Sequence, residues 1–245
     1  MLKRSRPLLV VYFPVADPEV SIEVLVAYAR CGVDVVEFGW PARDPYLDGT
    51  DVRASMARAR RDDPASALRD LSGRLAGFPD APKALLMTYA EADHPALADV
   101  AFFRGQDAVL VVASPSDPSR LALEARAKSS GVAISAFVPL PLDQVDVEAA
   151  RRADFYVMLQ AAPGVTGPRA ALDESNAERV ARLRRAGVSA PILLGFGISE
   201  RAQARKAVEF GADGIVVGSA ALRAARQGRA TLEDLLMGLR DGLDG

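Results

Sequence analysis

Cysteine and histidine are almost absent from this chain of 245 residues. The one cysteine, Cys31, has no second cysteine with which to form an intramolecular disulfide. The one histidine, His94, cannot supply the clustered imidazoles of a typical zinc site and is expected in a surface loop. We therefore expect no metal and no cofactor, and a reducing compartment such as the cytoplasm.

Long apolar runs and clusters of positive charge are missing as well. No apolar stretch is long enough to span a bilayer, and the run Leu8–Phe13 is only as long as a strand and lacks a signal-peptide cleavage site. The net charge is −2, and the arginines are scattered among acidic residues. Because a nucleic-acid surface needs clustered cations, we expect neither nucleic acid nor a membrane as a partner.

The residues that are present suit one globular domain over residues 1–245, with 50% hydrophobic and 25% charged side chains. Short β-branched runs alternate with stretches of helical period, which is typical of parallel βαβ units. The predicted strands are Leu8–Phe13, Val33–Phe38, Ala84–Tyr89, Ala108–Val112, Ala133–Val138, Phe155–Leu159, Ile192–Leu194 and Gly214–Val217. The predicted helices are Glu19–Arg30, Pro64–Leu75, Pro118–Ser129, Glu148–Arg152, Asn176–Ala186, Glu200–Phe210 and Leu232–Arg240.

Helix ends carry their own signals. Glycine precedes three predicted strands, at Gly32, Gly131 and Gly211, where it would end a helix in the left-handed conformation. Asp17, Asp117 and Ser199 are residues that favour helix starts. Eight such units could form a doubly wound open sheet, but no Gly-x-Gly-x-x-Gly turn follows the first strand. We therefore favour an α/β fold of the (β/α)₈ TIM-barrel type.

Two carboxylates lie where this fold places its chemistry, at and after a strand's carboxyl end. Glu37 interrupts the apolar run Val35–Phe38, and Asp48 follows in a loop stiffened by proline and glycine. Burial should raise the pKa of Glu37, which suits a general acid and base working near neutrality. The alternative is that Glu37 pairs with an arginine inside the barrel.

Glycine-rich loops follow the last three predicted strands. The loop Gly164–Gly167 has the composition of a segment that closes over a substrate, although an ordinary turn would look the same. Gly195 and Gly197 follow the seventh strand, and Gly218 with Ser219 follows the eighth and opens a helix. These two loops are the recurrent phosphate position of the fold. The glycines could instead serve only to turn the chain.

Lysine is too scarce and too remote for another barrel chemistry. A Schiff-base aldolase needs a lysine in the barrel mouth, but the lysines lie at the chain start, a strand entrance and two helices, at Lys3, Lys83, Lys128 and Lys206. What remains is acid and base chemistry by carboxylates on a phosphorylated substrate.

Five motifs in collinear order, between about Pro7 and Leu239, resemble the tryptophan synthase α subunit family. They are Glu37-x-Gly-x-Pro-x-x-Asp-Pro-x-x-Asp-Gly, Leu86-Met-Thr-Tyr, Gly164-Val-Thr-Gly, Gly195-Phe-Gly-Ile-Ser and Gly211-Ala-Asp-Gly-Ile-Val-Val-Gly-Ser. The last motif is shared by many phosphate-binding barrels, so the specificity comes from all five together.

The resemblance implies retro-aldol cleavage of indole-3-glycerol phosphate to indole and glyceraldehyde 3-phosphate. Glu37 would move the proton at indole C3 and at the side-chain hydroxyl, and Asp48 would hydrogen-bond the indole N–H. The other expected substrate-binding residues are Tyr12, Met87 and Tyr89 around the indole, Gly167, Gly197, Gly218 and Ser219 around the phosphate, and Thr166 and Gly195 in the matched loops.

Some positions depart from the family. Thr50 stands where the family has proline, Glu91-Ala92 where it has Asn-Pro, Ala113 where it has aspartate, and Met158 where it has a tyrosine. The family's extra N-terminal helix is not expected here. The first three positions lie on the side that faces the β subunit, so partner docking is in question and we expect indole release without one. The alternatives are another phosphate-binding barrel enzyme, or a weakly active protein that mainly activates a β subunit.

Overall fold

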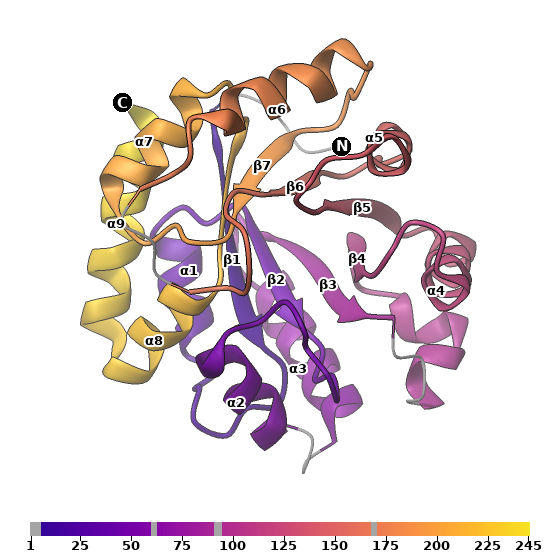
Figure 1. Cartoon of the computed structure of the whole chain (residues 1–245). Coiled ribbons are helices and arrows are strands. Elements are labelled where there is room, and N and C mark those ends of the chain that lie inside the picture. Colours follow the sequence, from indigo (N-terminus) through magenta and orange to yellow (C-terminus); the bar gives the residue numbers. More distant parts are fainter. Residues whose placement is uncertain (1–5, 60–62, 91–94, 168–170) are drawn as a thin grey trace.

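A closed barrel of parallel strands forms the centre of the molecule (Figure 1). The computed structural model describes residues 6–59, 63–90, 95–167 and 171–245. Within them, eight strands pair in sequence order and β1 closes the ring against β8. The strands are β1 Leu8–Pro14, β2 Val35–Gly39, β3 Lys83–Tyr89, β4 Ala108–Val112, β5 Ala133–Val138, β6 Val157–Gln160, β7 Ile192–Gly195 and β8 Gly214–Val217. The predicted (β/α)₈ barrel is confirmed.

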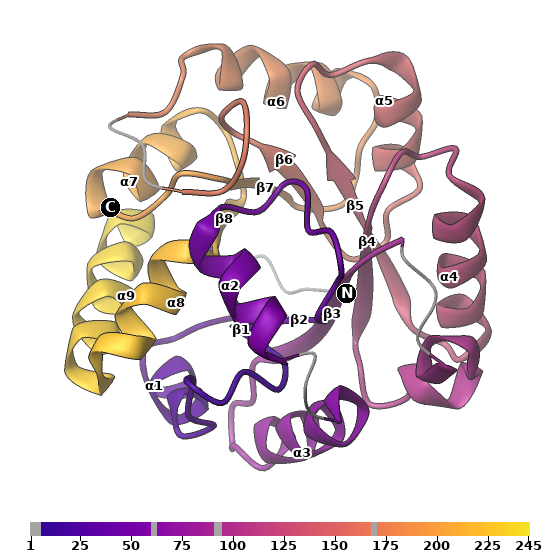
Figure 2. The ribbon, with the colours of Figure 1, turned by 60° about the horizontal axis from the view of Figure 1, so that its bottom comes forward.

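In the described part of the chain, all helices but one surround this barrel, and the exception, α2, lies across one of its ends (Figure 2). Figure 2 shows α2 across one end of the barrel, while the other labelled helices stand around its outside. The helices are α1 Val24–Arg30, α2 Thr50–Ala59, α3 Pro64–Ala76, α4 Pro118–Ser129, α5 Gln144–Arg151, α6 Ser175–Arg185, α7 Arg201–Glu209, α8 Ser219–Gln227 and α9 Arg229–Asp244, with 3₁₀ turns η1 Pro95–Ala98 and η2 Val100–Phe103. None of the helices in the described ranges is both long and apolar enough to span a membrane.

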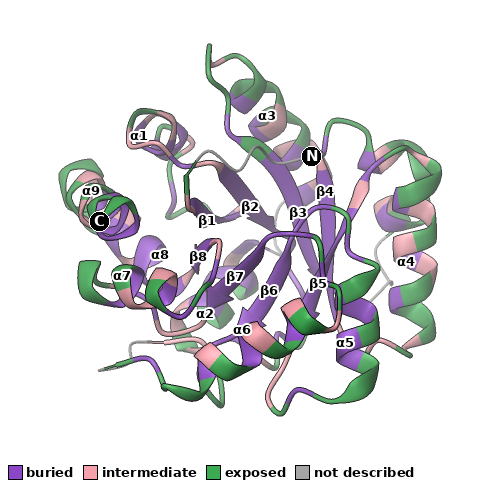
Figure 3. Ribbon diagram, turned by 90° about the horizontal axis from the view of Figure 1, so that it is seen from above, coloured by how far each residue is buried: buried purple, intermediate pink, exposed green. Residues whose placement is uncertain are grey.

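The strands are buried on both faces, because side chains fill the barrel and helices cover it (Figure 3). Every residue of β1 and β2 is buried, including the carboxylate of Glu37. Strand register pairs Tyr12 with Glu37 and Phe13 with Phe38. Since side chains alternate between the two faces of a strand, Tyr12 and Glu37 point the same way, into the barrel.

Several predicted helix limits need correction. Asp17 does not start a helix: α1 begins at Val24, and the Asp17 side chain binds Arg58 and Ser55 instead. The prediction that Ser199 starts a helix is also wrong, because Glu200 is the N-cap residue of α7. Helix α2 was not predicted, although its buried residues, Val52, Ser55, Met56 and Ala59, follow a helical period.

The other helix signals are confirmed. The Asp117 side chain accepts hydrogen bonds from two backbone N–H groups at the start of α4. Gly32, Gly131 and Gly211 follow helix ends with φ of 71°, 81° and 84°, a conformation that other residues adopt at a cost.

Candidate active site

One pocket opens at the carboxyl ends of the strands, with a volume of about 500 Å³ including its open mouth. Most of the predicted site residues line it, namely Tyr12, Glu37, Asp48, Met87, Tyr89, Thr166, Gly195 and Gly218. The rest of the lining is apolar, from Leu47, Val52, Val112, Phe137, Met158, Phe196 and Val216. A mostly apolar pocket with two convergent carboxylates suits a flat aromatic ligand that carries a few polar atoms.

Glu37 is buried in the barrel, with 3% of its surface exposed. Burial raises the pKa of this carboxyl from 4.5 to about 7, against a hydrogen bond that lowers it and with a smaller contribution from Asp48 that raises it. That hydrogen bond comes from the Tyr156 hydroxyl, 2.7 Å from Oε2. The alternative that Glu37 pairs with an arginine is therefore wrong, because its hydrogen-bond partner is a neutral phenol. A carboxyl with this pKa exists in both protonation states near pH 7 and can give or take a proton.

Asp48 is the second buried carboxylate, in the loop between β2 and α2. The Tyr89 hydroxyl donates to its Oδ2 at 2.7 Å, and the Thr166 hydroxyl donates to its Oδ1 at 3.1 Å. Burial raises its pKa, while these two hydrogen bonds and Arg53 act in the opposite direction. The two hydroxyls fix the direction of the carboxylate, so Asp48 is oriented to receive an N–H donor or to face a developing positive charge.

The loops after β2 and β6 are held together over the pocket. Thr166 N donates to Leu47 O at 2.9 Å, and Gly49 N donates to the Thr166 hydroxyl at 2.9 Å. A Cβ on Gly49 would stand 2.1 Å from Thr166 O, so only glycine allows this approach. At the other end of the loop, Gln160 Nε2 donates to Gly164 O at 2.9 Å. The predicted closing loop is therefore in contact with the loop that carries Asp48.

The two glycine-lined loops lie beside each other, after β7 and β8. Gly218 precedes α8, so the first backbone N–H groups of this helix, starting at Ser219, face the end of the barrel. In the other loop Phe196 and Gly197 have φ of 77° and 88°. A positive φ is costly for phenylalanine and is often found at functional sites. Gly197, Ser219 and Gly167 do not line the pocket itself.

The sequence analysis did not identify several residues of the site, among them Tyr156 and the aromatic pair Phe137 and Phe196. Tyr156 precedes β6 by one residue, and it lies on the inward side together with Met158, two residues later. The alternation of strand side chains could have identified it. Phe137 and Phe196 pack with ring centroids 5.8 Å apart, and no local pattern indicates this pair. Met158, at the position where the resembled family has tyrosine, packs 3.2 Å from where a Cβ on Gly195 would be.

Within the described part of the chain, neither a lysine in the pocket nor a metal-ligating cluster is found. Its lysines do not line the pocket: Lys83 forms an ion pair with Asp107 at 2.8 Å, and Lys128 and Lys206 lie on outer helices. Lys3 and His94 lie outside the described residues. Among the described residues no cluster of three metal-ligating side chains occurs.

Comparison with known proteins agrees with this geometry. The family model described as tryptophan synthase alpha chain matches residues 1–238. The tryptophan synthase alpha chain of Synechococcus elongatus is 30% identical, over 98% of this chain and 93% of that protein. A chain of Mycobacterium tuberculosis tryptophan synthase superposes with a TM-score of 0.82 at 23% identity, covering 99% of this chain and 94% of that one.

A further solved structure comes from the tryptophan synthase α2β2 complex of Pyrococcus furiosus, with a TM-score of 0.78 at 21% identity, over 96% of this chain and 98% of that chain. The match to the family model covers nearly the whole chain, and its barrel fold is the same. This chain belongs to the tryptophan synthase alpha chain family, whose members are lyases that cleave indole-3-glycerol phosphate to indole and glyceraldehyde 3-phosphate.

Proposed function

We propose that Glu37 and Asp48 carry out this cleavage in the pocket of the barrel. The observation that supports this most is the buried Glu37 carboxyl, whose hydrogen-bond partner is a phenol and whose pKa is about 7. Asp48 lines the same pocket and is oriented by two hydroxyls. The pair therefore combines a proton donor and acceptor with a fixed negative charge, which are different roles in different surroundings.

The reaction divides into two proton transfers. Protonated Glu37 gives its proton to indole C3, and the positive charge that develops on the ring is stabilised by Asp48 at the N–H. The Glu37 carboxylate then removes the proton of the neighbouring chain hydroxyl. That oxygen becomes the aldehyde, the C3–chain bond breaks, and its electron pair restores the indole ring. Glu37 ends protonated, so no group outside the pocket and the substrate is needed.

The phosphate of the substrate is assigned to the loops after β7 and β8. Gly197, Gly218 and Ser219 would donate their backbone N–H groups there, and the start of α8 adds a favourable dipole. Gly167, at the end of the loop after β6, would close over the same group. Phosphate-free indole-glycerol should bind much more weakly than the phosphate ester, and equal binding would contradict this assignment.

An indole-formation assay on the isolated chain tests the function directly. Wild type should release indole and glyceraldehyde 3-phosphate in equal amounts, and Asp48→Asn should lower kcat by about a hundredfold or more. Asp51→Asn is the matched control, because Asp51 pairs with Arg223 at 2.9 Å outside the pocket. If the wild-type chain forms no indole, with or without a β subunit, the proposed function is wrong.

Membership of the family supports two further proposals, on the partner and on the location. We propose that the chain docks on a tryptophan synthase β subunit, as the chain in the Pyrococcus furiosus α2β2 complex does. We also propose a cytoplasmic location and a single barrel domain over residues 1–245. Release of indole without the β subunit stays a separate prediction, which rests on the substitutions at Thr50, Glu91 and Ala113; Glu91 lies outside the described residues.

A further inference from the structure

Tyr12 lines the pocket, and its hydroxyl is buried with no residue in the described ranges that donates to it or accepts from it. Tyr12 is 3% exposed. Three other buried tyrosines of the barrel, Tyr28, Tyr89 and Tyr156, each donate a hydrogen bond of 2.7 to 2.9 Å within the protein. Because burial of a hydroxyl without a partner costs free energy, an unpaired hydroxyl on a residue that lines a ligand pocket indicates a partner on the ligand.

The Tyr12 side chain lies between the carboxyl ends of β8 and β2, the two strands that flank β1. Its Cβ lies 3.9 Å from where a Cβ on Gly218 would stand, next to the glycine-lined loop after β8. Its hydroxyl lies 2.4 Å from where a Cβ on Gly39 would stand, at the carboxyl end of β2. Only a glycine at position 39 leaves room for this ring. The hydroxyl is thus held on the β2 side, where Glu37 also faces the pocket.

The surroundings keep this hydroxyl protonated. Burial raises the pKa of Tyr12 well above its ordinary value, and the nearby Asp48 and Glu37 carboxylates raise it further. The group therefore enters the pocket as a neutral hydroxyl that can donate one hydrogen bond.

One part of the proposed substrate would lie between the same two positions, the loop after β8 and the carboxyl end of β2. Its phosphate would lie at the loops after β7 and β8, its reacting carbon at Glu37, and its three-carbon chain between them. That chain carries two hydroxyls. We infer that the Tyr12 hydroxyl hydrogen-bonds a hydroxyl of this chain, and that Tyr12 makes the pocket selective for a hydroxylated side chain. This inference rests on the proposed function.

Two ligands, one with and one without the chain hydroxyls, separate a hydrogen bond from Tyr12 from a general effect of the substitution on the pocket. One is indole-3-glycerol phosphate, and the other is 3-(indol-3-yl)propyl phosphate, which keeps the indole and phosphate but lacks both hydroxyls. Tyr12→Phe should lower kcat/KM for the first about three- to tenfold, the usual range for one neutral hydrogen bond. The inhibition constant of the second should stay the same or fall, because the variant no longer buries an unpaired hydroxyl.

Tyr28→Phe is the matched control. It removes the same atom from a buried tyrosine whose hydroxyl donates to Tyr12 O at 2.9 Å and which does not line the pocket. This control should lower thermal stability without changing the ratio between the two ligands. The pH at which kcat is half-maximal should also stay unchanged in Tyr12→Phe, since the hydroxyl acts on the substrate and not on Glu37.

Equal weakening of both ligands, no change for either, or a shifted pH profile would each overturn the inference. A failure of the proposed function gives a different result, because wild type would then form no indole and would not bind the propyl phosphate. If wild type does both and Tyr12→Phe does not discriminate, only the role of Tyr12 is wrong.

Discussion

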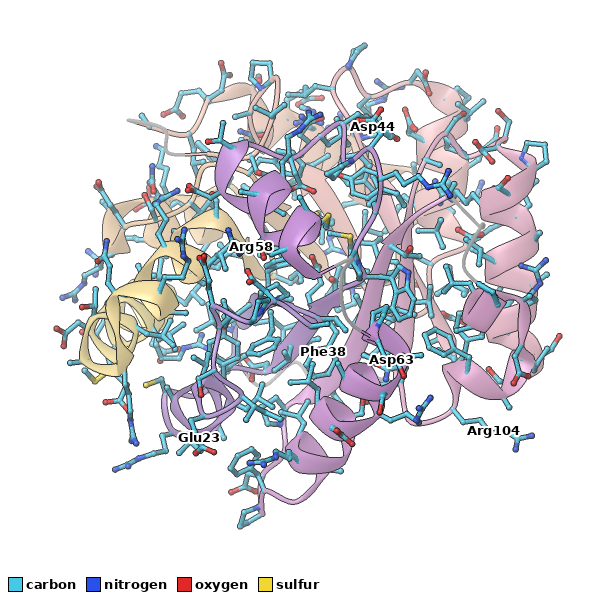
Figure 4. The ribbon with its side chains drawn as sticks, turned by 90° about the horizontal axis from the view of Figure 1, so that it is seen from below. Glu23, Phe38, Asp44, Arg58, Asp63 and Arg104 are labelled. Atoms are coloured by element: carbon cyan, nitrogen blue, oxygen red, sulfur yellow. The ribbon has the colours of Figure 1, made fainter. Side chains whose placement is uncertain are left out.

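Asp17 and Glu37 are both buried carboxylates near the carboxyl ends of neighbouring strands, yet their surroundings differ in one respect. Asp17, just after β1, accepts two hydrogen bonds from the Arg58 guanidinium, at 2.9 and 2.7 Å, and one from Ser55. Glu37 accepts one from the neutral Tyr156 hydroxyl. Figure 4 shows Arg58 on α2, the helix that crosses the barrel end. A charged partner is present at one carboxylate and is replaced by a phenol at the other.

The pKa values move in opposite directions as a result. Burial acts to raise the pKa of both, but at Asp17 the hydrogen bonds from Arg58 and Ser55 outweigh it and the pKa is lowered. At Glu37 burial dominates and the pKa rises to about 7. Asp17 is therefore ionised near neutral pH and acts as an anchor that ties α2 to the end of β1, whereas Glu37 can exchange a proton. Burial alone does not make a catalytic carboxyl; the choice of partner does.

The largest effect is expected from Glu37→Gln. The amide keeps an acceptor for Tyr156 but cannot move a proton, so kcat should fall by about a hundredfold to ten-thousandfold. Single-turnover indole formation measures the loss. Glu23→Gln, on an exposed carboxylate 3.2 Å from Arg74, should leave kcat unchanged. Near-wild-type turnover in Glu37→Gln would show that Glu37, like Asp17, does not transfer a proton in the reaction.

Asp17→Asn should act on stability instead. It removes the charge of the buried Asp17 carboxylate from the Arg58 guanidinium, which keeps Glu19 at 3.3 Å. The loss of these charge-assisted hydrogen bonds should cost about 1.5 to 3 kcal/mol of unfolding free energy. Urea denaturation at pH 7 measures this cost. Asp44→Asn is the control, because the Asp44 side chain is 69% exposed and 3.5 Å from Arg53, and such pairs contribute about 0 to 1 kcal/mol. Equal unfolding free energies for Asp17→Asn and Asp44→Asn would contradict the role of the anchor.

The pH dependence of stability should have opposite signs at the two sites. The lowered pKa of Asp17 gives stability that is complete above its ordinary pKa and is lost as the pH falls through the lower, folded value. The raised pKa of Glu37 favours the neutral form, so the folded state loses up to about 3 kcal/mol as the pH rises from 4.5 to about 7.

Comparing the unfolding temperatures of wild type and Glu37→Gln isolates the loss of stability that ionisation of Glu37 causes. The variant should unfold at a higher temperature than wild type at pH 8 and at nearly the same temperature at pH 4.5. The same ionisation should make kcat/KM of wild type decline above about pH 7, because C3 is protonated by the neutral carboxyl. A variant that gains no stability at pH 8 would show that Glu37 is not destabilised by burial.

The smallest effect concerns the β subunit. The loops after β2 and β6 are already bonded to each other through Thr166, Leu47 and Gly49, so a partner has less closing to do. We expect the isolated chain to release indole, with kcat/KM rising less than about tenfold when its own β subunit is saturating. A larger stimulation would show that the substitutions at Thr50 and Ala113 leave the partner dependence of the family intact.

Much of the fold was predictable because its signals are local. Strand and helix alternation, the glycines after helix ends and the Asp117 cap depend on neighbouring residues, and the structure confirms them. Helix α2 was not predicted; it lies across the barrel end, outside the regular alternation of strands and outer helices on which the prediction depended (Figure 2). Asp17 was misread because a capping aspartate and an ion-paired one look alike in sequence.

At the site, the sequence by itself predicted Glu37 and Asp48, through a carboxylate in an apolar run and a motif with fixed spacing, and both line the pocket. Their partners were decided by the tertiary structure. Tyr156 lies 119 residues from Glu37, and Thr166 lies 118 residues from Asp48. Such pairs form only when the barrel closes and brings β6 opposite β2, and no local pattern encodes them. The same closure leaves the buried hydroxyl of Tyr12, a residue that lines the pocket, without a protein partner in the described ranges, because register and packing, not residue type, decide which polar groups meet.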